Sequence, residues 1–437
     1  MSSVKLLNPL VRSDKVNVKA TDREMMEYAI ALVFAGSIEE GLALLNEVDE
    51  DSIPEVTLHR AIAHFNRWEY DRAIPYLEKF VQYQSEGYLL GVGRVNLASA
   101  YIFTSRFQDA KDVLDRIISR AIQEKNLLLE GYARELYVQV CIFSEEAKTS
   151  IRDSIDMARR CLSDANLVGR LYVDKWSAVA ELKEGNSVGL RRLLEVRDRA
   201  IQIRNWETAR DCDFQRLSFT KDQNLFDQLF IGTPFPEYRA RMQRLFGELN
   251  VPVKFAFEID SERPGVNVKS RPWVDMLSLE SNVKNFKIKA GHLFHRLLLS
   301  LTRDFYVPTN VNMVFAALHP KEYFNPVTSP QRVYSLVNRF NMEMDEAKVP
   351  MQVEVRNGCY RVVSVGCSVR LLVYSEEVSA ARSRLAAYKA GDCINSAQLA
   401  KEFGVSSRTA ARWLREAIGE GAVVSERKGR EIYYRVL

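Results

Sequence analysis

Two arginines near the end of the chain have the spacing that base recognition requires. Arg408 and Arg412 are one helical turn apart within residues 406–418, so both guanidinium groups would project from the same face of a helix. Arginine can bind guanine through two parallel hydrogen bonds, and a single α-helix fits the major groove of B-form DNA. Ser406 and Ser407 come just before them, at a helix start whose amide and hydroxyl groups suit phosphate. These residue types predict contacts with duplex DNA.

The segments around the two arginines read as two helices followed by a hairpin. Residues 396–405 have the pattern of a helix that ends at a glycine turn, and residues 406–418 that of a second helix with one apolar face. Residues 423–436 alternate in polarity on either side of a basic tip, as the strands of a hairpin do. Over residues 379–437 this order resembles the winged-helix module common in bacterial transcription regulators.

That resemblance implies a role for each polar position. The second helix would read bases and meet phosphates, and the basic hairpin tip would follow the DNA backbone or enter the minor groove. The implied DNA-binding residues of this module are Ser406, Ser407, Arg408, Arg412, Arg415, Arg427, Lys428 and Arg430.

A similar order of elements is expected earlier in the chain. Residues 291–302 and 310–318 read as helices, and Ser329-Pro330 opens a third helix with a serine cap and a proline in its first turn. Two alternating runs then flank Asn357-Gly358, the strongest two-residue hairpin signal.

Residues 251–375 therefore resemble the effector domains of OmpR-type response regulators. In that family a leading β-sheet precedes the three helices, and residues 251–289 are expected to form it. The resemblance implies that the third helix reads DNA and that the hairpin acts as a wing. The residues that carry these roles would be Arg332, Ser335, Asn338, Arg339, Arg356 and Arg361.

The front half of the chain is long, helical and poor in proline. Within residues 21–217 a large residue is followed three positions later by a small one, which lets two antiparallel helices approach closely. The first three such elements are 32 and 37 residues apart, which brackets the 34 of tetratricopeptide repeats. The elements are Ile38/Gly41, Tyr70/Ala73, Phe107/Ala110 and Trp206/Ala209.

Residues 21–217 thus resemble a tetratricopeptide-like solenoid of five or six helical pairs. Such an array has a concave groove that suits a peptide, a protein segment or a neighbouring domain. A non-repetitive helical bundle is the alternative. Residues 1–20 are taken as an N-terminal extension and residues 218–250 as a connecting helical segment.

Charge is distributed unevenly along the chain. Residues 1–264 sum to −5, residues 265–378 to +4 and residues 379–437 to +5, which gives the net charge of +4. A basic rear part suits a polyanion such as nucleic acid. Chance excesses on a solvated surface are the alternative explanation.

Several classes of protein are disfavoured. No apolar run reaches the ~18–20 residues of a membrane helix, so no membrane partner is expected. The first fifteen residues lack the apolar core and cleavage site of a secretion signal. The six cysteines form no CxxC pair, which argues against a disulfide framework or a zinc site and predicts a cytoplasmic location.

The sequence has no recognisable catalytic or cofactor-binding motif. The sequence holds no GxxxxGK[ST] phosphate loop, no catalytic constellation with supporting spacing, and no separate receiver-like domain before the OmpR-like segment. His292 and His295 are three residues apart on an expected helix, and a surface or DNA-backbone pair is favoured over a metal site. No cofactor and no metal are expected.

The sequence as a whole predicts a mainly α fold, in which an N-terminal α-solenoid of tetratricopeptide-like pairs precedes two small α+β winged-helix domains. The function predicted from it is that of a non-enzymatic, cytoplasmic, bacterial transcription regulator. Its helical-repeat domain would bind a protein or peptide or self-associate as a homodimer, and its two winged helices would contact duplex DNA. The alternatives are a scaffold subunit whose winged helices bind proteins, and an enzyme with an unrecognised site.

Overall fold

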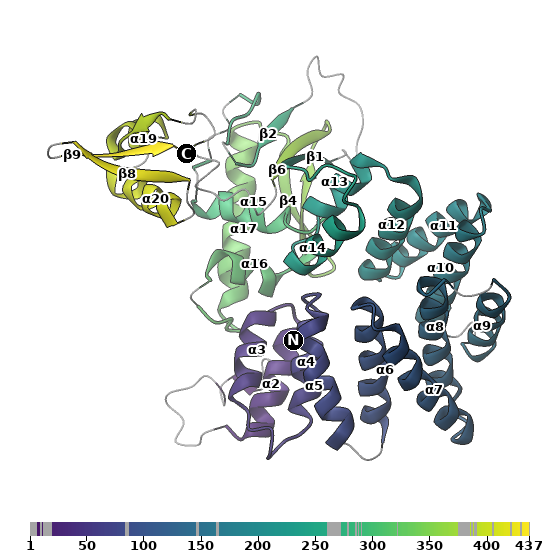
Figure 1. The fold of residues 1–437 in the computed structure, drawn as a ribbon. Helices are drawn as coiled ribbons and strands as arrows, with labels where there is room; N and C mark the ends of the chain where they lie inside the picture. The colour runs from purple at the N-terminus through teal and green to yellow at the C-terminus, as the bar shows by residue number, and fades with distance from the viewer. Residues whose placement is uncertain are drawn as a thin grey trace. The chain divides into compact units, whose positions relative to one another are not determined.

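The structure is a computed structural model of the 437-residue chain. It describes residues 7, 8, 11, 20–83, 87–145, 148–162, 166–259, 272–277, 279–284, 286, 288–289, 291–320, 322–374, 385, 388, 391–403, 406–419, 422–428 and 431–436. The described chain is mainly helical, with three small three-stranded sheets in its rear part (Figure 1). It divides into two compact units, the first of residues 1–250, 304–335 and 356–360, and the second of residues 251–303, 336–355 and 361–437.

The first unit begins with helices that follow one another as antiparallel pairs (Figure 1). Each helix packs against the next, and the first helices of neighbouring pairs also touch, as in α2 with α4, α6 with α8, α8 with α10, and α10 with α12. The pairs are α2 (Asp22–Phe34) and α3 (Ile38–Glu47), α4 (Val56–Phe65) and α5 (Tyr70–Tyr83), α6 (Tyr88–Phe103) and α7 (Phe107–Gln123), α8 (Leu127–Phe143) and α9 (Lys148–Cys161), α10 (Leu167–Lys183) and α11 (Val188–Gln202), and α12 (Trp206–Thr220) and α13 (Gln223–Ile231).

The small residues identified in the sequence lie where two helices come closest. A Cβ added to Gly41 would meet Val33 Cγ2 at 2.6 Å and the Ala29 carbonyl oxygen at 2.8 Å. The alanines of the other three elements are likewise buried. The elements at Ile38, Tyr70 and Phe107 begin the second helix of a pair, whereas the one at Trp206 begins the first helix of the last pair.

Gly189 is the small residue of the pair in which the sequence pattern found none. A Cβ on Gly189 would lie 2.7 Å from the Ala178 carbonyl oxygen and 2.9 Å from Leu182 Cγ, which matches the surroundings of Gly41. The large residue that normally precedes it by three positions is replaced by Asn186, so the spacing pattern could not reveal it.

A second recurring feature is an asparagine cap. The side chains of Asn126, Asn166 and Asn205 each accept a hydrogen bond from the backbone three residues later and begin α8, α10 and α12. These asparagines are 40 and 39 residues apart. The later pairs therefore follow a longer period than the earlier ones.

The close approach at Gly189 can be tested by adding one methyl group. We expect Gly189→Ala to lower the free energy of unfolding by about 1–3 kcal/mol, because overpacking forces the two helices apart. Gly91→Ala is the matched control, since its Cβ would meet Leu129 at an ordinary 3.4 Å and alanine favours a helix over glycine. Denaturant unfolding followed by circular dichroism measures both, and equal stability of the two variants would refute the close approach.

Helix α14 (Pro236–Leu245) folds back onto the helical pairs. Tyr238 lies edge-on to Trp68, with ring centroids 4.7 Å apart, and the Arg241 guanidinium lies 4.8 Å above Phe103 and 5.1 Å from the Phe214 ring. Burial of its side chain lowers the pKa of Arg241. Residues from α6 and α12, more than a hundred positions apart, therefore meet on one side chain of α14.

A buried ion pair fixes residues 304–307 against α12. Arg210 has a fully buried side chain, and its Nη2 donates to both carboxylate oxygens of Asp304 at 2.7 and 2.6 Å. Two residues along, the hydroxyl of Tyr306 donates to Asp213 at 2.9 Å. The Asp304 carboxylate also accepts from the backbone of Tyr306 and Val307, so this turn is held from both sides.

Removing the anion of this pair should destabilise the first unit strongly. We expect Asp304→Ala to lower the free energy of unfolding by about 3–5 kcal/mol, because it leaves a buried guanidinium without its main partner. Glu207→Ala removes a second carboxylate that pairs with Arg210; because the Glu207 side chain is 54% exposed and Asp304 remains, the loss should be smaller, about 1.5–3 kcal/mol. Urea unfolding compares the two, and a small loss in Asp304→Ala would contradict the assigned role of the pair.

The elements between residues 254 and 374 form two sheets and three helices. The helices are α15 (Leu293–Leu301), α16 (Val311–Leu318) and α17 (Ser329–Glu346), and the strands are β1 (Lys254–Ile259), β2 (Trp273–Asp275), β3 (Thr309–Asn310), β4 (Met351–Arg356), β5 (Cys359–Ser364) and β6 (Val369–Tyr374). The strand orders are β1-β6-β2 and β3-β5-β4.

The expectation of a leading sheet made by residues 251–289 is wrong in its composition. That segment supplies β1 and β2, but they lie on opposite sides of β6, which is antiparallel to β1 and parallel to β2. The central position between them is occupied by β6, which follows the β4–β5 hairpin in the chain. The further strand expected at residues 266–270 lies outside the described residues.

The last part of the chain has its own small core. Strand β7 (Cys393–Ile394) and helices α19 (Ser396–Glu402) and α20 (Ser407–Gly419) precede the hairpin of β8 (Val423–Lys428) and β9 (Glu431–Val436), in the sheet order β7-β9-β8. Leu399, Trp413, Leu414 and Tyr434 are buried together in this core. Among the described residues of the whole chain, no helix combines the length and apolarity needed to cross a bilayer.

Candidate nucleic-acid interface

Helix α20 combines a buried apolar face with an exposed basic one. Ser406 starts the helix by accepting a hydrogen bond from the backbone N–H of Thr409, 3.1 Å from its hydroxyl oxygen. Ala410, Trp413 and Leu414 turn into the core and fix how the helix rotates about its axis. The exposed residues on the other side are Ser407, Arg408, Arg412 and Arg415.

The β8–β9 hairpin has a cation, Arg427, near its tip, as the sequence predicts. Arg427 is exposed and pairs in register with Ile432 across the two strands. Lys428 pairs with Glu431 at the last described register position, and Arg430 lies outside the described residues. Arg435 of β9 forms an ion pair with Glu426 of β8, so the charge of Arg435 is compensated within the hairpin.

Helix α17 belongs to residues 251–375, called the middle module below, and has one buried and one exposed side. Val333, Val337 and Phe340 are buried, and their spacing of four and three residues puts them on one side of the helix. The four predicted reading residues, Arg332, Ser335, Asn338 and Arg339, are exposed.

Arg332, however, is bound within its own module. Its Nη1 lies 2.5 Å from the Glu322 carboxylate, and its guanidinium carbon lies 5.2 Å from the centre of the Phe315 ring. The hydrogen bond from Arg332 lowers the pKa of Glu322. A contact between Arg332 and DNA would have to replace this pair.

The β4–β5 hairpin has the tight turn expected at Asn357-Gly358. Both residues have positive φ, 55° and 76°, as a two-residue turn between twisted strands requires. Arg356 and Arg361 are exposed at its two sides. Arg361 donates to Glu354 across the hairpin at 2.8 Å, so its charge is partly compensated.

The sequence-based interpretation of the two histidines is wrong for His295. This side chain is 8% exposed, its Nδ1 accepts from the Gly291 backbone at 2.9 Å, and its Nε2 contacts the Met276 carbonyl oxygen at 2.9 Å. It therefore joins two backbone segments, and only His292, which precedes α15, is exposed. The spacing between His292 and His295 could not show the burial of His295, because its partner Met276 lies outside helix α15. Within the described ranges, no group of three metal-ligating side chains occurs.

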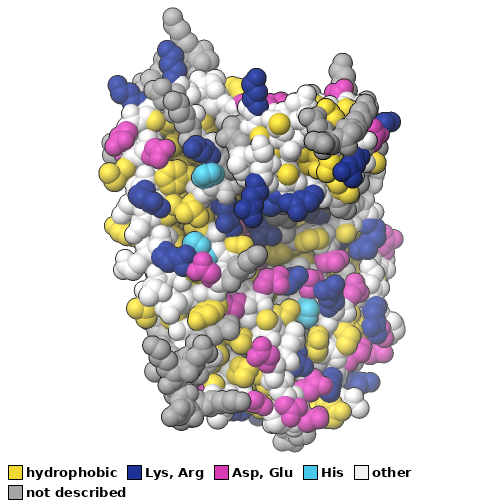
Figure 2. All heavy atoms as spheres, turned by 90° about the vertical axis from the view of Figure 1, so that its left-hand side faces the viewer, with side chains coloured by type: hydrophobic (Ala, Val, Ile, Leu, Met, Phe, Trp, Pro, Cys, Tyr) yellow, Lys and Arg dark blue, Asp and Glu magenta, His cyan; other side chains and the backbone are white. Residues whose placement is uncertain are grey.

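Two features of these modules were not identified from the sequence. Trp413, between Arg412 and Leu414, is the largest side chain of the α20 core. Tyr334 and Met342 on α17 are 55% and 63% exposed among the polar residues. Figure 2 likewise shows hydrophobic side chains among Lys and Arg side chains on the face that it draws.

No protein-family model matches this chain, and a search of curated proteins gives no match. The function is therefore inferred from the geometry and charge described above.

Proposed function

We propose that this protein is a DNA-binding transcription regulator of the bacterial cytoplasm. A tetratricopeptide-like helical-repeat domain binds a protein or peptide partner, or a second copy of the chain, and two winged-helix modules contact duplex DNA. The observation that carries the proposal is the exposed arginine row of α20, defined as Arg408, Arg412 and Arg415, opposite a buried face.

The arginine row has dimensions that suit the major groove. Its residues occupy positions i, i+4 and i+7, so they span about 10 Å along the helix axis at ~1.5 Å per residue. That length is close to three base-pair steps of ~3.4 Å each along a strand. In this proposal Arg408 and Arg412 read bases, and Arg415 and Ser407 meet phosphates at the edge of the groove.

The C-terminal module is the primary reader in this proposal. Its arginine row is supported by the exposed Arg427 of the hairpin, which takes the part of a wing. In the middle module, Arg332 and Arg361 are in ion pairs with Glu322 and Glu354. Exposed pairs of this kind are worth only about 0–1 kcal/mol. Phosphates can therefore replace them once the C-terminal module has brought DNA close. The linkage raises avidity through effective concentration.

The repeat-domain assignment is supported by the helix contacts. Consecutive antiparallel pairs with contacts between their first helices are what a stacked array requires. Helix α14 covers the surface around Phe103 and Phe214. An external partner is therefore expected on a part of the array that α14 leaves open.

A scaffold subunit is the second candidate function. The exposed Tyr334 and Met342 on α17 favour it, because aromatic and methionine side chains are enriched in protein interfaces. In that case the middle module would bind a protein and the arginine row would have no duplex to read.

Salt dependence separates the two candidates. We expect the full chain to bind a random 30-base-pair duplex, with affinity falling roughly 100-fold between 50 and 200 mM salt if about four phosphates are contacted. Fluorescence anisotropy with labelled duplex measures the slope. Negligible duplex affinity at 50 mM salt would overturn the proposal in favour of the scaffold.

The base-reading role belongs to two specific side chains. Arg408→Ala and Arg412→Ala should each weaken binding to a selected duplex site by about 1–3 kcal/mol, while affecting random duplex less. Arg191→Ala removes another exposed arginine, on α11, whose side chain is 74% exposed, and should change neither affinity. Selection of the site from random sequence, followed by titration, provides the measurement. Equal losses on selected and random duplex would assign both arginines to the backbone instead.

A further inference from the structure

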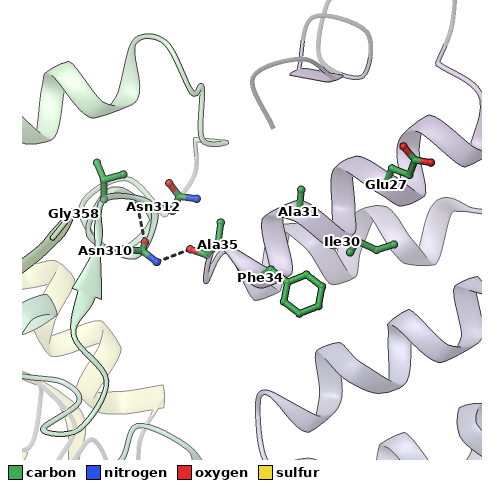
Figure 3. A pocket seen from close by; sticks show the side chains of 9 residues that line it. Glu27, Ile30, Ala31, Phe34, Ala35, Asn310, Asn312 and Gly358 are labelled. Carbon is green, nitrogen blue, oxygen red and sulfur yellow. Dashed lines mark hydrogen bonds between the residues drawn. The ribbon is translucent and has the colours of Figure 1, made fainter. Parts of the chain in front are cut away.

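A cavity of about 600 Å³ lies in the first unit beside the first helix of the array (Figure 3). One wall is the stripe Glu27, Ile30, Ala31 and Phe34 of α2, which are spaced so that they share one helix face. The opposite wall is residues 310–312 at the start of α16, together with Gly358. Its volume is within the ~300–1,000 Å³ range of pockets that hold small ligands.

The two walls are fastened to each other by specific contacts. Asn310 Nδ2 donates to the Ala35 carbonyl oxygen at 2.8 Å, and a Cβ on Gly36 would lie 2.7 Å from Met313 Cγ. A third contact joins the Phe324 backbone N–H to the Glu40 carboxylate at 3.2 Å. The cavity is therefore a formed feature of this unit.

Asn312 supplies an unused polar group at this site. Its side chain is 1% exposed, and neither its amide nitrogen nor its amide oxygen has a hydrogen-bond partner in the described structure. Figure 3 shows this amide projecting from α16 toward α2. Its neighbour Asn310 donates to the Ala35 carbonyl oxygen and accepts from the backbone N–H groups of Asn312 and Met313, and no hydrogen bond joins the two asparagine side chains. A buried amide left unpaired costs about 1–3 kcal/mol, which a complementary ligand would recover.

We propose that this cavity binds a short linear peptide. The Asn312 amide would accept from one backbone N–H of the peptide and donate to a carbonyl oxygen, because a primary amide offers both functions. An apolar peptide side chain would lie against Ile30 and Phe34, the latter 72% exposed. This inference rests on the proposed function, since it identifies the partner of the helical-repeat domain.

The charges around the cavity specify which peptide fits. The nine described lining residues include the carboxylate of Glu27 and no lysine or arginine. Phosphorylated or acidic ligands would meet repulsion from Glu27 and no cation among the described lining residues. A peptide with one apolar residue and one basic residue, the latter near Glu27, satisfies all three features of the site.

The test uses a random heptapeptide display library selected on the immobilised full chain. We expect enriched sequences to combine apolar residues with lysine or arginine, and the synthetic peptides to bind with a Kd that rises at least tenfold in Asn312→Leu. Because Leu removes an unpaired buried amide, the variant should unfold at or above the wild-type temperature. Phe34→Ser alters an exposed position and should weaken binding without affecting the fold.

Asn224→Leu is the matched control, since this asparagine is exposed on α13 and distant in sequence from the cavity. Failure to enrich any peptide over the bare support would overturn the inference. So would equal affinity of the peptides for wild type and Asn312→Leu, which would mean that water alone satisfies the amide. Duplex affinity measured without peptide should be the same in Asn312→Leu and wild type. Its absence in both would end the DNA proposal and leave the peptide result intact.

Discussion

The first unit depends on a charge pair that is removed from water. Arg210 on α12 and Asp304 are 94 positions apart in the chain, and both are almost fully buried. Such a pair gains little net free energy over an apolar replacement, because desolvation offsets the attraction, but breaking it is costly. Its main effect here is geometric. It fixes where the chain re-enters the first unit after α15, and thereby where β3 and α16 begin and how Asn310 and Asn312 meet α2.

The parts of the fold that could be predicted from sequence are those set by local spacing. The starts of α3, α5 and α7, the buried stripe of α17 and the turn at Asn357-Gly358 all follow from residues within one or two turns of each other. The parts that could not be predicted depend on distant partners. The burial of His295, the insertion of β6 between β1 and β2, and the Arg210–Asp304 pair each need a residue that no local pattern identifies.

The same distinction applies to the candidate sites. The exposed row Arg408, Arg412 and Arg415 could be inferred because helical periodicity alone decides which side of α20 is apolar. The engagement of Arg332 with Glu322 could not, because it depends on the path of the loop before α17. Nor could the cavity beside α2, whose walls are joined by contacts between distant residues such as Asn310 and Ala35, 275 positions apart. The two helix-and-hairpin modules thus share an order of elements, and in the middle one Arg332 and Arg361 are engaged in ion pairs.

The strand order β1-β6-β2 also has a consequence for synthesis on the ribosome. The two outer strands are translated first, and the strand that joins them follows more than ninety residues later. At ~5–20 residues per second, β1 and β2 wait for about 5–20 s with unpaired edges. During that interval this part of the nascent chain is open to mispairing, so its folding is controlled by the arrival of residues 369–374.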